Sequence, residues 1–133
     1  MSGPAEARSL RTRLGRVRGL GSAKEGVAHW WAQRITALAL VPLTFWLAAS
    51  LAALAGAPHA EVVAWLRGPL AAALMVVLLA TGFHHLQLGV QVVVEDYVHT
   101  GWLKLTVIIA VKFTSVLAAL IGVFAVLRIA LGA

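Results

Sequence analysis

The sequence of 133 residues contains no cysteine and only five acidic residues. Without cysteine the chain cannot form a disulfide, bind an iron–sulfur cluster through thiolates, or use a cysteine nucleophile. Charged residues of both signs make up 12% of the sequence, against about 25% in soluble domains. Because so little charge is available to cover a surface, an ordinary soluble globular domain is excluded.

Apolar residues take the place of the missing charge. They make up 61% of the sequence, and the mean hydropathy is +0.90. Soluble domains contain about 45–50% apolar residues, and a helix needs about 20 consecutive apolar residues to cross a bilayer. We therefore expect an all-α integral membrane protein, a bundle of three transmembrane helices, with no separate soluble domain.

Three long apolar stretches predict the membrane spans. Pro42 should kink the first span or lie near its first turns. Pro69 suits the first turn of the second span, where a missing N–H is tolerated. The predicted spans cover residues 35–55, 69–94 and 108–129.

Helix-breaking residues separate the predicted spans. The glycine and proline in 56–59 end the first span, and Glu61 and Arg67 mark a short loop after it. A turn is expected around 99–101. A helical run that begins at Trp102 should continue into the third span.

The basic residues give the chain a formal net charge of +6. They flank the spans, which favours a membrane topology signal over a nucleic-acid site. Arg67 and Arg128 lie on one side, and the larger group lies before the first span, joined by Lys104 after the second. By the positive-inside rule the N-terminus is cytoplasmic and the C-terminus outside. The group before the first span is Arg8, Arg11, Arg13, Arg16, Arg18, Lys24 and Arg34.

This distribution divides the chain into a basic cytoplasmic N-terminal segment, 1–28, and a three-span membrane-anchor domain, 29–133. The basic segment is interpreted as a tail on an anionic leaflet. An Arg-rich mitochondrial transit peptide is the alternative, and no secretory signal is expected because no apolar stretch follows Met1.

The end of the second span contains most of the polar chemistry. His85 and Gly89 are four positions apart and share a helix face, and Asp96 returns to it after about three turns. If Tyr97 marks the water interface, His85 lies about 18 Å deeper, past the middle of a core about 30 Å thick. A histidine there is costly unless it has a function, and an imidazole is a strong axial ligand for haem iron. Gly89 would let a flat macrocycle approach the helix; the alternative is a histidine bonded to a neighbouring helix.

The pattern His85-x-x-x-Gly89-x-x-x-Val93-x-x-Asp96-Tyr97 resembles the small hydrophobic membrane-anchor subunit of succinate dehydrogenase, respiratory complex II. The resemblance implies a bacterial inner membrane protein with three partners: a companion anchor (cytochrome b) subunit, an iron–sulfur subunit and a flavoprotein subunit. It also implies that succinate is oxidised at flavin in the periphery and that electrons pass through iron–sulfur clusters to ubiquinone.

Within this resemblance, His85 is one axial ligand of haem b, and a histidine of the companion subunit is the other. His84 points about 100° away from His85, so it is expected to pack toward a partner helix. Tyr97 donates a hydrogen bond to a quinone carbonyl, and Asp96 holds a basic partner or passes protons. The alternatives are an interfacial tyrosine and a solvated helix end.

The residues before the first span extend the resemblance, which covers roughly 20–133. The segments 21–26 and 29–34 are similar to the region before the first span in bacterial members. The resemblance places His29 and Arg34 near the haem propionates, although both also fit a topology signal. Trp30 and Trp31 are interpreted as interfacial belt residues.

Three readings of the whole chain stay open beside this one. The chain is a cofactor-free accessory or assembly subunit, whose polar groups bond between helices; it is the anchor of a fumarate reductase; or it belongs to a mitochondrial inner membrane. Lys112, inside the third span, either extends toward the interface or pairs with a carboxylate.

Overall fold

The computed structural model describes residues 14, 17 and 24–132 of the chain. Apart from residues 14, 17 and 24–28, the basic segment 1–28 lies outside the described residues, together with the predictions made for it. The helices that follow are α2 (Lys24–Ala53), α3 (His59–Arg67), α4 (Pro69–Tyr97) and α5 (Gly101–Leu131). Three of them, α2, α4 and α5, are long and apolar enough to cross a membrane. The predicted all-α fold with three spans is confirmed.

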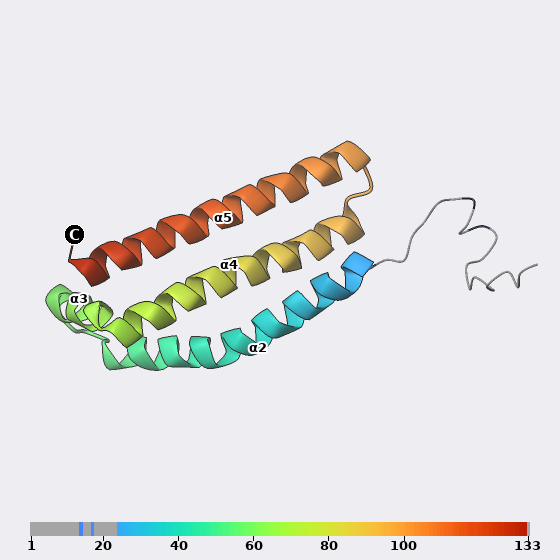
Figure 1. Cartoon of the computed structure of the whole chain (residues 1–133). Coiled ribbons are helices and arrows are strands. Elements are labelled where there is room, and N and C mark those ends of the chain that lie inside the picture. The colour runs from blue at the N-terminus through green and yellow to red at the C-terminus, as the bar shows by residue number, and fades with distance from the viewer. Residues whose placement is uncertain (1–13, 15–16, 18–23, 133) are drawn as a thin grey trace, which may run out of the picture.

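Helix α4 lies between α2 and α5 and packs against both (Figure 1). Within the described residues no Cα atom of α2 lies within 8 Å of a Cα atom of α5. The short helix α3 connects α2 to α4 and packs against α4 and α5. Because α4 is central, its side chains face α2 on one side and α5 on the other. Neighbouring polar residues on α4 can therefore contact different helices.

Few side chains are buried in this arrangement. Large apolar side chains are exposed along all three long helices, as expected where lipid or another subunit covers the surface. Lipid is as apolar as leucine, so helices in a membrane associate through close packing of small residues and through polar contacts. The buried residues within the described part are Leu43, Ala72, Leu88, Val94, Ser115 and Val126.

The predicted start of the first span is wrong as a helix boundary. Helix α2 begins at Lys24 and ends at Ala53, so residues 29–34 lie inside the helix and not before it. No proline interrupts residues 24–34, and the backbone continues to bond to itself beyond the apolar stretch. Pro42 lies well inside α2. Proline has no N–H to donate within a helix and commonly kinks it, and α2 bends along its course (Figure 1).

The other predicted boundaries lie within a few residues of the observed ones. Helix α4 starts at Pro69, at the predicted position, and continues to Tyr97. Residues 98–100 form the turn, and α5 starts at Gly101. The loop predicted after residue 59 is wrong, because α3 forms there with Glu61 in its first turn and Arg67 in its last. Both charges oppose the helix dipole favourably.

Candidate functional site

Helix α4 holds His85 and Tyr97 on one continuous helix of 29 residues. Twelve positions separate the two side chains, or about 18 Å along the axis. Because this helix is unbroken, the depth of His85 below Tyr97 expected from the sequence spacing applies to the structure. His85 lies within the apolar part of this helix, and Tyr97 is its last residue.

His85 is half-buried and faces both α2 and an apolar recess of about 420 Å³. Its Nδ1 lies 2.9 Å from the hydroxyl oxygen of Thr36 on α2. Gly89 lines the same recess, so the predicted shared face of these two residues is confirmed. The recess is lined by His85, Leu86, Gly89, Val90 and Val93.

The chain itself does not require glycine at position 89. A Cβ there would meet only the Nε2 of Gln33, at 3.7 Å, which is ordinary van der Waals contact. Packing within the described part of the chain therefore does not explain the glycine. Gln33 has a second notable feature: its Oε1 is buried and has no hydrogen-bond partner within the described residues.

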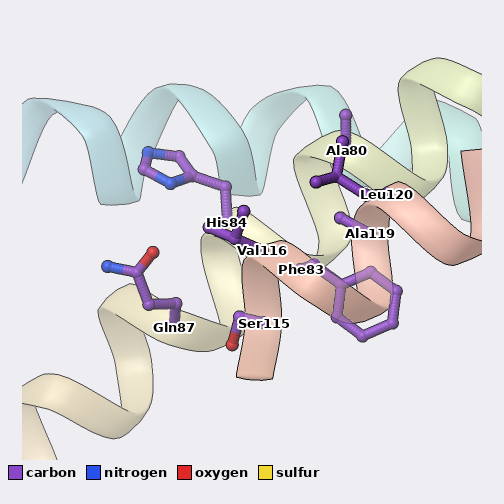
Figure 2. Close-up of a pocket in the computed structure, with 8 residues that line it drawn as sticks. All are labelled: Ala80, Phe83, His84, Gln87, Ser115, Val116, Ala119 and Leu120. Atoms are coloured by element: carbon purple, nitrogen blue, oxygen red, sulfur yellow. The ribbon is translucent and has the colours of Figure 1, made fainter. Parts of the chain in front are cut away.

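His84 lies in different surroundings from His85. It is exposed and lines a recess of about 170 Å³ between α4 and α5, together with Gln87 and Ser115 (Figure 2). It also lines a larger, more polar recess of about 550 Å³ that reaches Lys112. The larger recess is lined by Gly26, His29, His84, Gln87, Leu88, Gln91, Glu95 and Lys112.

Asp96 and Tyr97 lie exposed at the end of α4, and the side chain of Tyr97 is 78% exposed. Their neighbour Glu95 holds this end of the helix in place. Its carboxylate accepts a hydrogen bond from the Gln91 amide at 2.8 Å, and its backbone carbonyl accepts one from Lys104 Nζ at 3.0 Å. Lys104 belongs to α5, so the contact ties the two helices together across the turn.

The structure does not bring His29 and Arg34 together. His29 lines the polar recess beside His84, and its Nε2 is buried with no partner within the described residues. Arg34 is exposed, with its guanidinium carbon 5.4 Å from the centre of the Trp30 ring. Trp30 in turn packs edge-on against Trp31, at 5.0 Å between ring centres.

Two polar residues near His85 were not predicted from the sequence. Thr36 and Gln33 stand three positions apart on α2, so they share a helix face, and that spacing was the available signal. Among the described residues no group of three or more His, Cys, Asp or Glu side chains is placed to hold a metal ion. His85 contacts Thr36 through Nδ1, and the residue lines an apolar recess.

The comparisons with known proteins agree with this architecture. Residues 8–119 match the family described as "Succinate dehydrogenase/Fumarate reductase transmembrane subunit". The succinate dehydrogenase hydrophobic membrane anchor subunit of Rickettsia bellii (strain RML369-C) is 36% identical over 118 residues, covering 88% of this chain and 94% of that protein.

The corresponding subunit of Paracoccus denitrificans is 34% identical over 116 residues, covering 86% of this chain and 88% of that protein. No solved structure was found to match the chain. A family match over most of the chain, and bacterial relatives matched over nearly their whole length, agree with the three apolar helices. The chain therefore belongs to the succinate dehydrogenase/fumarate reductase transmembrane subunit family, as a hydrophobic membrane anchor subunit.

Proposed function

We propose that this anchor subunit binds haem b through His85, jointly with a companion anchor subunit, and forms part of a ubiquinone reduction site with Tyr97 and Asp96. One observation carries the proposal: a histidine deep in an apolar helix lines an apolar recess together with a glycine. An ionisable side chain at that depth is costly and therefore usually has a function.

The residues around His85 fit a haem. An imidazole is an established axial ligand of haem iron, and the recess beside it has an apolar wall suited to a porphyrin face. Packing within the chain does not explain Gly89, whereas a planar group lying on the helix would. Bound haem would supply a one-electron redox centre inside the membrane. The second axial ligand would come from a histidine of the companion subunit.

Arg34 and His29 are the proposed neighbours of the haem propionates. The guanidinium of Arg34 is planar and permanently charged, which suits a carboxylate, and it lies exposed at the surface of α2. The buried Nε2 of His29 has no partner among the described residues, so it is available to a polar group from outside the chain.

The proposed quinone site lies at the end of α4, where Tyr97 is the last residue. The phenol of Tyr97 is a hydrogen-bond donor, and its exposure lets a head group entering from the bilayer reach it. Asp96 places a carboxylate beside it. Reduction of ubiquinone takes up two protons with two electrons, and a carboxylate at the interface can pass protons from water.

The proposed setting is a complex in the bacterial inner membrane. The companion anchor subunit, an iron–sulfur subunit and a flavoprotein subunit would bind this chain, whose N-terminus is cytoplasmic. Exposed apolar side chains on all long helices offer surface for lipid and for the companion subunit. Since the matched family includes both succinate dehydrogenases and fumarate reductases, a fumarate reductase anchor is the second candidate.

The proposal is tested by replacing each histidine of the pair separately. In the purified complex, His85→Ala should remove the visible spectrum of low-spin haem, because the imidazole ligand is lost. His84→Ala is the matched control, since it changes the adjacent position on the same helix, and it should leave that spectrum in place. Unchanged low-spin haem in His85→Ala would refute the assignment. A wild-type complex without a Soret band would favour a cofactor-free accessory subunit.

A further inference from the structure

Thr36 on α2 contacts the imidazole of His85 on α4, with 2.9 Å between the hydroxyl oxygen and Nδ1. We infer that the Thr36 hydroxyl fixes the ring orientation and tautomer of His85, so that Nε2 is the nitrogen left for iron. The inference rests on the haem function proposed above. It makes Thr36 a positioning residue, on α2, for a ligand on α4.

On this inference, the hydrogen atoms of the contact are assigned starting from the three oxygen and nitrogen atoms around the Thr36 hydroxyl. The Thr36 hydroxyl oxygen lies 2.7 Å from the backbone carbonyl oxygen of Ala32 and 3.1 Å from that of Gln33. A carbonyl oxygen can only accept, and the contact with the Ala32 carbonyl is the shortest that the hydroxyl makes, so we assign the single hydroxyl hydrogen of Thr36 to that bond. Ser and Thr commonly bond backward in this way inside helices.

The hydroxyl oxygen still has lone pairs with which to accept a hydrogen bond. His85 Nδ1 lies 2.9 Å away from it, and the pair is bonded only if Nδ1 carries the hydrogen. A neutral imidazole has one N–H, so Nε2 then carries the lone pair. Metal-bound histidines commonly donate their other N–H to a protein oxygen in this way, which fixes the tautomer and the ring orientation.

The bond has an electronic consequence for a haem ligand. Donation from Nδ1 makes the imidazole a more basic ligand, which favours ferric over ferrous iron. Hydrogen bonding to an axial ligand is one of the ways in which a protein adjusts a haem potential. Removing the Thr36 hydroxyl should therefore raise the midpoint potential of the haem.

The experiment compares four variants in the purified complex by redox titration and haem content. Thr36→Val keeps the shape and removes the hydroxyl; Thr36→Ser keeps the hydroxyl. Thr36→Ala is a second hydroxyl deletion, to be used if Thr36→Val does not assemble. Thr44→Val is the matched control, since Thr44 makes the same backward bond on α2, at 2.7 Å to the Leu40 carbonyl, and is exposed.

We expect the hydroxyl deletions to shift the ferrous-to-ferric ratio at a fixed potential by about three- to tenfold toward ferrous, where tenfold corresponds to 59 mV. Loss of haem from the deletions, with retention in Thr36→Ser, would also support the inference, because the unrestrained ring can then rotate. Thr36→Ser and Thr44→Val should match the wild type.

Two results would overturn the inference. One is a wild-type potential and haem content in the hydroxyl deletions; the other is an equal effect of Thr36→Ser, which would mean that packing and not the hydroxyl matters. The proposed haem function has its own separate test. If His85→Ala retains low-spin haem, that function fails, and no behaviour of the Thr36 variants can restore it.

Discussion

Tyr97 ends α4 and is the most direct test of the quinone proposal at the scale of a single residue. Its hydroxyl is the only group lost in Tyr97→Phe, and a hydrogen bond between neutral groups contributes about 0.5–1.5 kcal/mol net. If catalysis depends on orienting the quinone carbonyl, we expect quinone reduction to fall about tenfold or more, equivalent to about 1.4 kcal/mol in the barrier.

The control for Tyr97→Phe is built into the complex. Succinate oxidation with an artificial acceptor that reacts at the peripheral subunits should stay near the wild-type rate, and the haem content should not change. Equal rates of quinone reduction in variant and wild type would make Tyr97 an interfacial belt residue. A parallel fall in both activities would indicate a role in assembly.

Gly89 offers a second prediction for a single residue. Gly89→Ala adds one methyl group that meets only Gln33, at an ordinary distance, so helix packing within the chain should be kept. Gly89→Leu fills part of the apolar recess beside His85 and should prevent a planar group from lying there. We expect the leucine variant to lose most of its haem in the visible spectrum while the complex still assembles. Full haem content in Gly89→Leu would show that the recess is not the haem site.

At the scale of helices, α4 and α5 pack closely together at Gly122. A Cβ at this position would lie 3.2 Å from Leu79 Cδ1 on α4, closer than most real contacts. Gly122→Ala should be tolerated if the leucine shifts slightly. Gly122→Leu should overpack the contact and cost about 1–3 kcal/mol.

Thermal denaturation of the solubilised complex measures this effect as a fall in the midpoint temperature. Gly82→Ala is the matched control on α4, because its Cβ would meet Leu40 at an unstrained 3.9 Å. Gly82→Ala should keep the wild-type midpoint, and a wild-type midpoint in Gly122→Leu would refute close packing at Gly122.

The sequence predicted helices well where a breaker marks their ends and poorly where none does. Pro69 and the 98–100 turn limit α4, and the prediction was close. The start of α2 at Lys24 has no such marker. Hydropathy indicates which residues lie in the apolar core of the membrane, and a helix can extend beyond that core. Helix α3 was not predicted, because Glu61 and Arg67 were interpreted as polar loop residues. An acidic residue followed six positions later by a basic one also fits the first and last turns of a short helix.

In the candidate site, the arrangement of residues along one helix was predicted, whereas the contact between two helices was not. Spacing along one helix correctly placed His85 and Gly89 on a common face, because helical periodicity is local. The contact between His85 and Thr36 joins residues 49 positions apart, and it depends on how α2 packs against α4. Periodicity within each helix carries no information about that packing.

At the scale of the whole molecule, basic residues lie toward both ends of the bundle, apart from Lys112, which lies inside α5. Arg34 and Lys104 lie toward the end where α2 and α5 begin, whereas Arg67 and Arg128 lie toward the opposite end. Basic residues are concentrated on the cytoplasmic side of membrane proteins. This distribution, together with the basic residues before α2, predicts that the turn between α4 and α5 faces the cytoplasm.

The orientation can be measured with single cysteines, because the chain has none of its own. His59 and His99 lie exposed at opposite ends of the membrane-spanning region, at the start of α3 and in the turn after α4. A thiol reagent that cannot cross the membrane should label His59→Cys in right-side-out vesicles and His99→Cys in inverted vesicles. Both should be labelled after the vesicles are opened with detergent, which controls for shielding by other subunits. Labelling of both from one side would refute the three-span topology, and the reverse assignment would place Tyr97, and with it the proposed quinone site, on the outer face.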